Sequence, residues 1–131
     1  NNITSNNVSD NTETGIILRY SSYNTISDNK VTGNNDWGIC LSWGSNYNTI
    51  TNNNLNANQW SNVRMFDSNN NLVSDNNASN CYAGSGISLS NSSYNTFTGN
   101  VIVNSDSVGI RLDSSCNNII FNNILNNTKY P

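Results

Sequence analysis

Aromatic side chains gather in the first half of the chain, and their types suit the binding of sugars. Flat aromatic faces can stack on the apolar faces of sugar rings, and arginines can hydrogen-bond hydroxyl groups or pair with acidic sugars. The residues expected to contact such a ligand are Tyr20, Trp37, Trp43, Trp60, Arg64, Phe66, Asp67 and Arg111. The alternative is that the aromatic rings shield the backbone of turns and that the charges keep the protein in solution.

Two pairs of carboxylates are the candidates for catalysis. A glycosidase needs two carboxylates roughly 5 to 9.5 Å apart, and the candidates on the aromatic side are Asp67 and Asp113. Asp28 and Asp75 form a second pair, and Lys30 supplies an amine near Asp28 for lyase chemistry. The members of each pair are separated by two sequence repeats, near or beyond that limit. We therefore expect binding without catalysis, and a polysaccharide lyase or glycoside hydrolase if the chain is an enzyme.

A third interpretation comes from hydroxyl side chains that recur in Thr-x-Thr pairs. Regular arrays of threonine hydroxyl and methyl groups on flat repeats resemble ice-binding surfaces, although threonine is also an ordinary strand residue. Leu72 and Ile119 interrupt the array. Its pairs are Asn2/Thr4, Thr25/Ser27, Thr49/Thr51, Leu72/Ser74, Thr96/Thr98 and Ile119/Phe121.

The residue inventory gives no reason to expect a metal or another cofactor. The chain has no histidine, which is the usual general base near neutral pH and the commonest metal ligand. Cys40, Cys81 and Cys116 occupy three different positions of the repeat without Cys-x-x-Cys spacing. We therefore predict neither a zinc site nor a disulfide between neighbouring repeats.

Charge and hydropathy argue against binding of nucleic acid and against insertion into a membrane. The net charge is −3 with only five lysines and arginines, which gives no basic surface for nucleic acid or anionic lipid. The sequence contains neither an apolar run long enough to cross a bilayer nor a signal peptide.

The elements that must position these residues follow from a repeat of 23 or 24 residues. Six units carry the pattern Asn-x-apolar-x-x-Asn, and two residues later comes a second apolar position. A glycine followed by apolar-x-apolar closes the unit, as in Gly38-Ile39-Cys40-Leu41. A fixed period of this size indicates stacked units, each of which buries its apolar face against the next.

Within each unit, apolar residues alternate with polar ones, which is the period of a strand. Three short strands cannot pair within one unit, so each must pair with its equivalent in the next unit, about 4.8 Å along an axis. The sequence predicts an all-β fold, a single-stranded parallel β-helix of about 5.5 rungs, which forms one domain over residues 1–131.

Asparagines at fixed corners of the rungs are expected to stack. Composition alone, with 33 asparagines in 131 residues, would suggest a disordered polar tract, but the phasing indicates ladders in which side-chain amides bond to one another and to turn backbone. The two predicted ladders are Asn1, Asn24, Asn48, Asn71, Asn95, Asn118 and Asn6, Asn29, Asn53, Asn76, Asn100, Asn123.

Three irregularities interrupt the repeat. Asn62 replaces the glycine of one unit, and because asparagine tolerates positive φ we expect a left-handed backbone there. Two units are one residue longer, through Trp43-Gly44 and through an insertion within residues 77–85. We expect these extra residues to lie in surface turns.

Neither end of the chain carries a recognisable polar cap. Uncapped rungs expose strand edges, so end-to-end self-association is expected. The simplest explanation is that the chain is a fragment of a longer protein.

The paired Asn-x-Ile-x-x-Asn and Gly-Ile-x-Leu blocks resemble the right-handed parallel β-helix repeats of NosD-like proteins and of the carbohydrate-binding and sugar-hydrolase group. Asparagine-rich versions resemble archaeal, especially methanogen, cell-surface proteins. The resemblance implies the fold, and an extracellular or cell-surface location. Its members include polysaccharide lyases and hydrolases, a copper-maturation factor and surface proteins, so fold alone does not choose among activities.

These observations together predict a secreted or cell-surface β-helix scaffold that binds a polysaccharide or a cell-surface glycan. The aromatic side is the expected contact surface.

Overall fold

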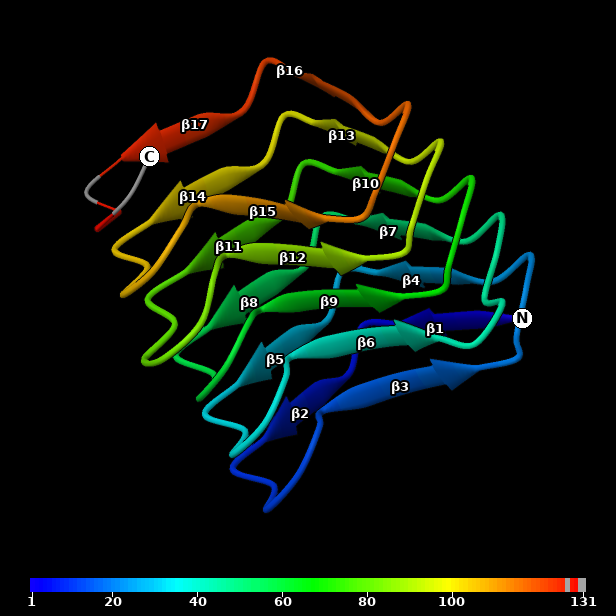
Figure 1. Cartoon of the computed structure of the whole chain (residues 1–131). Helices are drawn as coiled ribbons and strands as arrows, with labels where there is room; N and C mark the ends of the chain where they lie inside the picture. Colours follow the sequence, from blue (N-terminus) through cyan, green and yellow to red (C-terminus); the bar gives the residue numbers. More distant parts are fainter. Residues whose placement is uncertain (127, 130–131) are drawn as a thin grey trace.

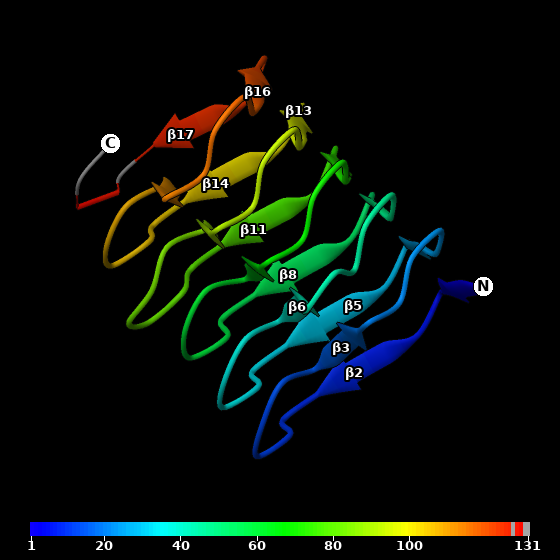
Figure 2. The same ribbon diagram turned by 45° about the vertical axis from the view of Figure 1, so that its right-hand side comes forward.

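The computed structural model describes residues 1–126 and 128–129, and it is built from strands and turns alone. Seventeen strands wind as a coil in which each full turn, or rung, contributes one strand to each of three parallel sheets (Figures 1 and 2). The predicted all-β parallel β-helix is confirmed, with five complete rungs and two strands of a sixth.

Sheet A contains the first strand of every rung, in spatial order from one end of the coil to the other. Its members are β1 (Asn2–Thr4), β4 (Thr25–Ser27), β7 (Thr49–Thr51), β10 (Leu72–Ser74), β13 (Thr96–Thr98) and β16 (Ile119–Phe121). Sheet B contains the second strands, which are β2 (Asn7–Ser9), β5 (Lys30–Thr32), β8 (Asn54–Asn56), β11 (Asn77–Ser79), β14 (Val101–Val103) and β17 (Ile124–Asn126).

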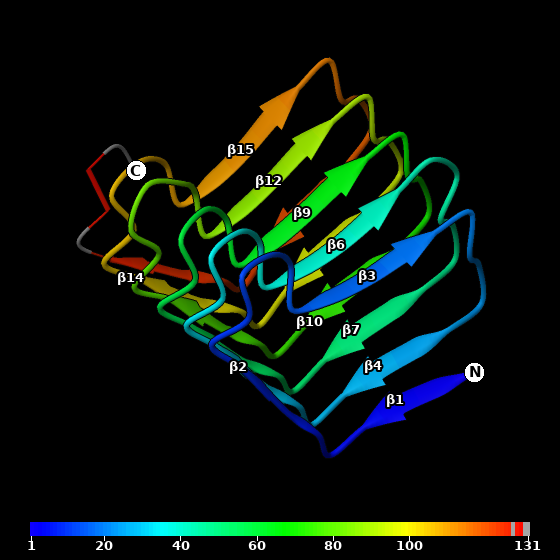
Figure 3. The same cartoon turned by 90° about the horizontal axis from the view of Figure 1, so that it is seen from below.

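Sheet C contains the longest strands and forms the face that Figure 3 shows uppermost. They are β3 (Ile16–Arg19), β6 (Ile39–Ser42), β9 (Val63–Phe66), β12 (Ile87–Ser90) and β15 (Ile110–Asp113). Equivalent residues of successive rungs pair with each other, so Leu18 lies beside Leu41 and Leu41 beside Met65. This register stacks each sequence position into a column along the coil.

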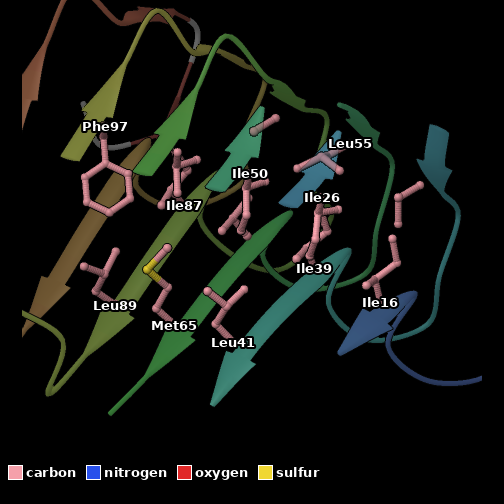
Figure 4. Close-up of a cluster of buried hydrophobic side chains, with 14 of the residues drawn as sticks. Ile16, Ile26, Ile39, Leu41, Ile50, Leu55, Met65, Ile87, Leu89 and Phe97 are labelled. Atoms are coloured by element: carbon pink, nitrogen blue, oxygen red, sulfur yellow. The ribbon is translucent and has the colours of Figure 1, made fainter. Parts of the chain in front are cut away.

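The inward columns form one continuous hydrophobic core (Figure 4). Each strand of sheets A and B points its central residue into the coil, and each strand of sheet C points two residues inward. In the middle rungs these inward side chains are completely buried. Phe97 is the largest of them and fills the column that Ile50 and Val73 occupy in earlier rungs. Full burial of a side chain of this kind contributes about 1.5 to 3 kcal/mol.

Both predicted asparagine ladders are present. In each ladder the side-chain carbonyl accepts from the backbone and side-chain amides of the asparagine one rung earlier. Asn76 is typical: its Oδ1 accepts from Asn53 N at 2.9 Å and from Asn53 Nδ2 at 3.0 Å. Its Nδ2 donates to Asn100 Oδ1 and to two backbone carbonyls, at 2.9 to 3.0 Å. A buried polar side chain that makes so many bonds stabilises the core rather than weakening it.

A third, shorter ladder was missed by the sequence analysis. It runs through Asn11, Asn34 and Asn58, whose side chains bond in the same way at 2.7 to 3.2 Å. In the next rung the column continues with Cys81, which cannot replace the amide. The Nδ2 of Asn58 donates instead to Asn62 Oδ1 at 2.7 Å, within its own rung.

The prediction of a left-handed backbone at Asn62 is wrong, because neither Asn62 nor the equivalent glycines have positive φ. Glycine is required there by close packing. A Cβ on Gly38 would lie 2.6 Å from the carbonyl oxygen of Asn62 and 2.8 Å from Asn58 Nδ2. Asn62 fits because its side chain is the partner that ends the third ladder and also donates to the Ser79 carbonyl at 2.8 Å.

The left-handed residues lie instead at the corners between sheets. One file immediately precedes the second ladder and includes Asp28, Asn52 and Asp75, with φ of 55° to 57°, followed by Gly99 at 67°. Aspartate, asparagine and glycine tolerate this conformation best. The corners therefore explain why these residues recur beside the ladder asparagines.

Both insertions lie in turns, as expected. Trp43 and Gly44 follow β6 with φ of 51° and 79°, and a Cβ on Gly44 would meet no atom within 4 Å. The second longer segment connects β11 to β12 over residues 80–86.

The last strand of each sheet exposes residues that are buried elsewhere in the coil. Leu112, Ile120 and Leu125 point along the inward columns but are 40% to 41% exposed, because no rung covers them here. End-to-end association through such a surface stays a prediction.

Replacing a ladder asparagine should destabilise the whole coil. Asn76→Ala removes an almost completely buried amide and leaves the bonding groups of Asn53, Asn100 and two carbonyls without partners. We expect a loss of about 3 kcal/mol or more in the free energy of unfolding, since each unsatisfied buried group costs about 1 to 3 kcal/mol. Chemical denaturation followed by circular dichroism measures it.

The matched control is Asn54→Ala, which truncates an exposed asparagine one rung away that faces solvent on β8. It should change the free energy of unfolding by less than about 0.5 kcal/mol. Equal losses in the two variants would contradict a stabilising role of the ladder.

Candidate functional site

The outer face of sheet C carries most of the predicted binding residues. Alternation along its strands points one file outward through Ile17, Cys40, Arg64, Ser88 and Arg111. A second outward file holds Arg19, Ser42, Phe66, Ser90 and Asp113. Because equivalent residues lie one rung apart, these files run along the axis of the coil, across the strands.

A hollow of about 300 Å³ lies over the first three strands of this sheet. Two walls of aromatic residues border it. Trp37 precedes β6, whereas Trp43 follows the same strand and Phe66 ends the next. The remaining lining residues are Ile17, Arg19, Cys40, Ser42 and Arg64. Four of the predicted site residues are therefore brought together here.

A second hollow of about 220 Å³ continues toward the C-terminal rungs. It is lined by Trp37, Trp60, Arg64 and Arg111, with Ser61, Ser85, Ser88 and Ser107 among the polar residues. Trp37 and Arg64 line both hollows, so the two adjoin. We call the pair of adjoining hollows the sheet C groove, and its lining extends from Ile17 in the first rung to Arg111 in the fifth.

Trp43 is held in place by contacts on its ring. The guanidinium carbon of Arg19 lies 4.5 Å from the centre of its ring, a cation–π contact, and the ring of Tyr20 lies 5.6 Å away. Trp43 is nevertheless 40% exposed, and Tyr20 is still more exposed. Tyr20 therefore supports the wall of the groove and does not line it.

The arginines of the groove differ in their partners. Arg64 reaches over β12 and donates to Ser88 Oγ at 2.8 Å and to Ser90 Oγ at 2.9 Å. Both acceptors are neutral, so they leave its charge uncompensated. Arg111 forms an ion pair with Asp113, with 2.8 Å between Nε and Oδ2. It is the one ion pair within the described part of the chain.

Cys40 lies in the floor of the groove and is almost completely buried. Burial raises the pKa of its thiol to about 11, against a smaller opposite effect of Arg64. The thiol is therefore protonated at neutral pH and behaves as an apolar floor residue, not as a nucleophile.

Asp67 and Asp113 are not brought together as a catalytic pair. Asp113 lies in the same column as Phe66, two rungs away, and Asp67 follows Phe66 in a left-handed turn with φ of 47°. Two rung spacings are about 10 Å, and Asp113 is engaged by Arg111. Asp28 and Asp75 lie in the turns between sheets A and B, away from the groove.

The Thr-x-Thr pairs share the outer face of sheet A in the predicted register. Leu72, Ile119 and Phe121 also lie there, and all three are exposed. Some hydroxyls bond to each other, as Ser74 Oγ does to Thr51 Oγ1 at 3.0 Å. The hydroxyl array is thus confined to stretches interrupted by apolar side chains.

Three exposed tyrosines were missed by the sequence analysis. Tyr23, Tyr47 and Tyr94 lie in the turns from sheet C to sheet A, on the right of Figure 1. The signal was available, because each precedes a ladder asparagine in the triplet Tyr-Asn-Thr. Arg19 was not among the predicted site residues, although it lines the groove.

A wider hollow of about 510 Å³ lies between the turns from sheet B to sheet C near the C-terminal end. Its lining residues are Asn80, Cys81, Tyr82, Asn104, Ser105, Asp106, Thr128 and Lys129. None of them is a predicted site residue and Tyr82 is the one aromatic residue among them, so the sheet C groove is the stronger candidate.

The side chains of the groove are suited to binding a ligand. Aromatic faces, guanidinium groups and hydroxyls suit a ligand with apolar ring faces and polar or anionic edges. No group of three or more histidine, cysteine or acidic residues within the described ranges could hold a metal ion. In the same ranges no helix is long and apolar enough to cross a membrane.

Solved structures with a similar fold include an alginate epimerase and a mannuronan epimerase. The periplasmic alginate epimerase AlgG superposes with a TM-score of 0.74 at 19% sequence identity, over 99% of this chain and 39% of the epimerase chain. The A-module of the mannuronan C-5 epimerase AlgE4 from Azotobacter vinelandii gives a TM-score of 0.72 at 15% identity, over 99% of this chain and 54% of the module.

At these identities the likeness establishes the fold alone, and the chain spans about two fifths to one half of the length of these proteins. No curated protein matches the sequence. The family model described as a right handed beta helix region matches residues 1–131, and the chain belongs to this family of right-handed parallel β-helix proteins.

Proposed function

We propose that this chain is a β-helix scaffold, secreted or held at the cell surface, that binds an acidic polysaccharide along the sheet C groove. The observation that carries the proposal is the extent of the groove, whose two adjoining hollows are lined by three tryptophans and three arginines over a span of five rungs. A site of this shape suits a linear ligand better than a small compact one.

The length of the groove supports a polymer. From Ile17 to Arg111 it crosses four rung spacings, about 19 Å along the axis. Trp43 and Phe66 on one side and Trp37 and Trp60 on the other would contact ring faces of several successive sugar units.

The charge distribution supports an anionic ligand. The chain has five basic residues and a net charge of −3, yet Arg19, Arg64 and Arg111 all line the groove. Arg64 bonds only to neutral serine hydroxyls among the contacts of the described residues, which leaves its charge for a carboxylate. The structural neighbours that act on alginate and mannuronan, both polymers of uronic acids, support the same ligand class.

Binding without turnover is the activity that the carboxylates support best. A general acid and its partner must approach the same bond, but Asp113 is paired with Arg111 and Asp67 belongs to a turn two rungs away. An envelope or extracellular location agrees with the periplasmic location of the structural neighbour AlgG.

Truncation of the groove should weaken binding of a mannuronate hexasaccharide. Trp43→Ala removes a ring face and Arg64→Ala removes a cation, and each should raise the Kd about tenfold, since a loss of 1.4 kcal/mol corresponds to that factor. Isothermal titration calorimetry measures it. Tyr82→Ala, which truncates an exposed tyrosine outside the groove, is the control and should leave the Kd unchanged. Absence of binding by the unaltered protein would refute the proposal.

Salt should weaken the same complex. Arginine–carboxylate contacts on an open surface are screened, with a Debye length that falls from about 30 Å at 0.01 M to about 3 Å at 1 M ionic strength. The Kd should therefore rise several-fold over this range in the unaltered protein and less in Arg64→Ala. A Kd independent of salt would show that the arginines do not recognise the acidic groups.

A further inference from the structure

The turns from sheet C to sheet A carry a file of exposed tyrosines that the proposed function does not use. Successive rungs place Tyr23, Tyr47, Asn70, Tyr94 and Asn117 at this corner, with φ between 55° and 60°. The backbone bonds of neighbouring turns are equivalent, as in Tyr23 N to the Asn46 carbonyl and Tyr47 N to the Asn69 carbonyl, both 3.2 Å. The five residues therefore form one column.

Tyrosine is an unexpected residue in this column. A positive φ is unfavourable for bulky side chains, whereas asparagine tolerates it, and Asn70 and Asn117 occupy the same turn in other rungs. The rings contribute nothing to the core, because Tyr23, Tyr47 and Tyr94 are 74%, 51% and 61% exposed. Packing of the core therefore does not explain why three rungs carry tyrosine where two others carry asparagine.

The stacked rings of Tyr23 and Tyr47 show that this column accommodates one ring per rung. Tyr23 and Tyr47 stack with ring centres 5.1 Å apart and planes within 5° of parallel, close to the rung spacing of about 4.8 Å. Tyr47 and Tyr94 are two rungs apart, about 10 Å, with Asn70 between them. A ring placed over Asn70 would thus lie about 5 Å from each tyrosine, at ordinary stacking distance.

Asn70 is suited to meet the edge of such a ring. It is exposed, its backbone N–H donates to the Ser93 carbonyl at 3.2 Å, and its side-chain amide has no hydrogen-bond partner among the described residues. The amide supplies both a donor and an acceptor, which match the hydroxyl groups around a sugar ring.

We propose that the rung-three corner is a second binding site, in which one pyranose ring stacks between Tyr47 and Tyr94 above Asn70. A pyranose has the two apolar faces that the tyrosines need and the polar edge that the amide needs. The site shares its ligand class with the proposed function but uses other residues and no cation, so neutral sugars should occupy it.

The test uses methyl pyranosides of glucose, galactose and mannose as probes, and saturation-transfer NMR as the readout. We expect saturation transfer from the protein to the ring protons of at least one probe, and a loss of at least about fivefold in Tyr47→Ala and in Tyr94→Ala. Asn70→Tyr should lower the signal at least as much as Tyr47→Ala does, because the new ring would occupy the place of the sugar.

Asn70→Tyr is the decisive variant, since three other rungs accept tyrosine at this corner and the chain should fold normally. Arg64→Ala, which is expected to weaken binding in the sheet C groove, should leave the pyranoside signal unchanged. The inference is overturned if none of the three probes shows transfer, or if transfer in Asn70→Tyr is as strong as in the unaltered protein. Either result leaves binding of the acidic hexasaccharide in the groove as a separate question.

Discussion

Register between equivalent residues is the constraint on which the rest of this structure depends. Every strand pairs with its counterpart one repeat away, and the buried asparagine amides are satisfied only when that pairing is kept. A slip of one residue would turn the inward apolar columns to solvent and break three ladders together. The same rule that fills the core also aligns the outward side chains into files, so the binding surface is a consequence of the register and not a separate construction.

Residues that contact the equivalent residue of the next rung were the most predictable from the sequence. The two long ladders, the three strands per rung and the apolar columns all follow from the 23- or 24-residue period. The third ladder escaped because Cys81 ends it after three asparagines, and Asn62 was misread because the crowding around Gly38 involves residues from another rung. Such contacts depend on the width of the coil at that point, which a period does not specify.

The candidate site was predictable in its residues but less so in its shape. The aromatic and arginine positions suggested one face, and the structure places Trp37, Trp43, Trp60, Arg64, Phe66 and Arg111 around the sheet C groove. The side-chain contacts that decide their roles could not be read from spacing. Arg64 extends over a neighbouring strand, Arg111 turns to Asp113, and Arg19 covers the ring of Trp43. Each choice depends on rotamers that sequence order leaves open.

A groove that runs across strands also has a mechanical consequence for the coil. Each rung contacts only its neighbours, so single rungs of an unliganded coil can open locally. A chain of sugars lying from Ile17 to Arg111 would contact rungs that share no direct contact with one another. Opening any one of those rungs would then cost contacts to the ligand as well as to its neighbours, and the bound polymer would make the five rungs unfold as a more cooperative unit.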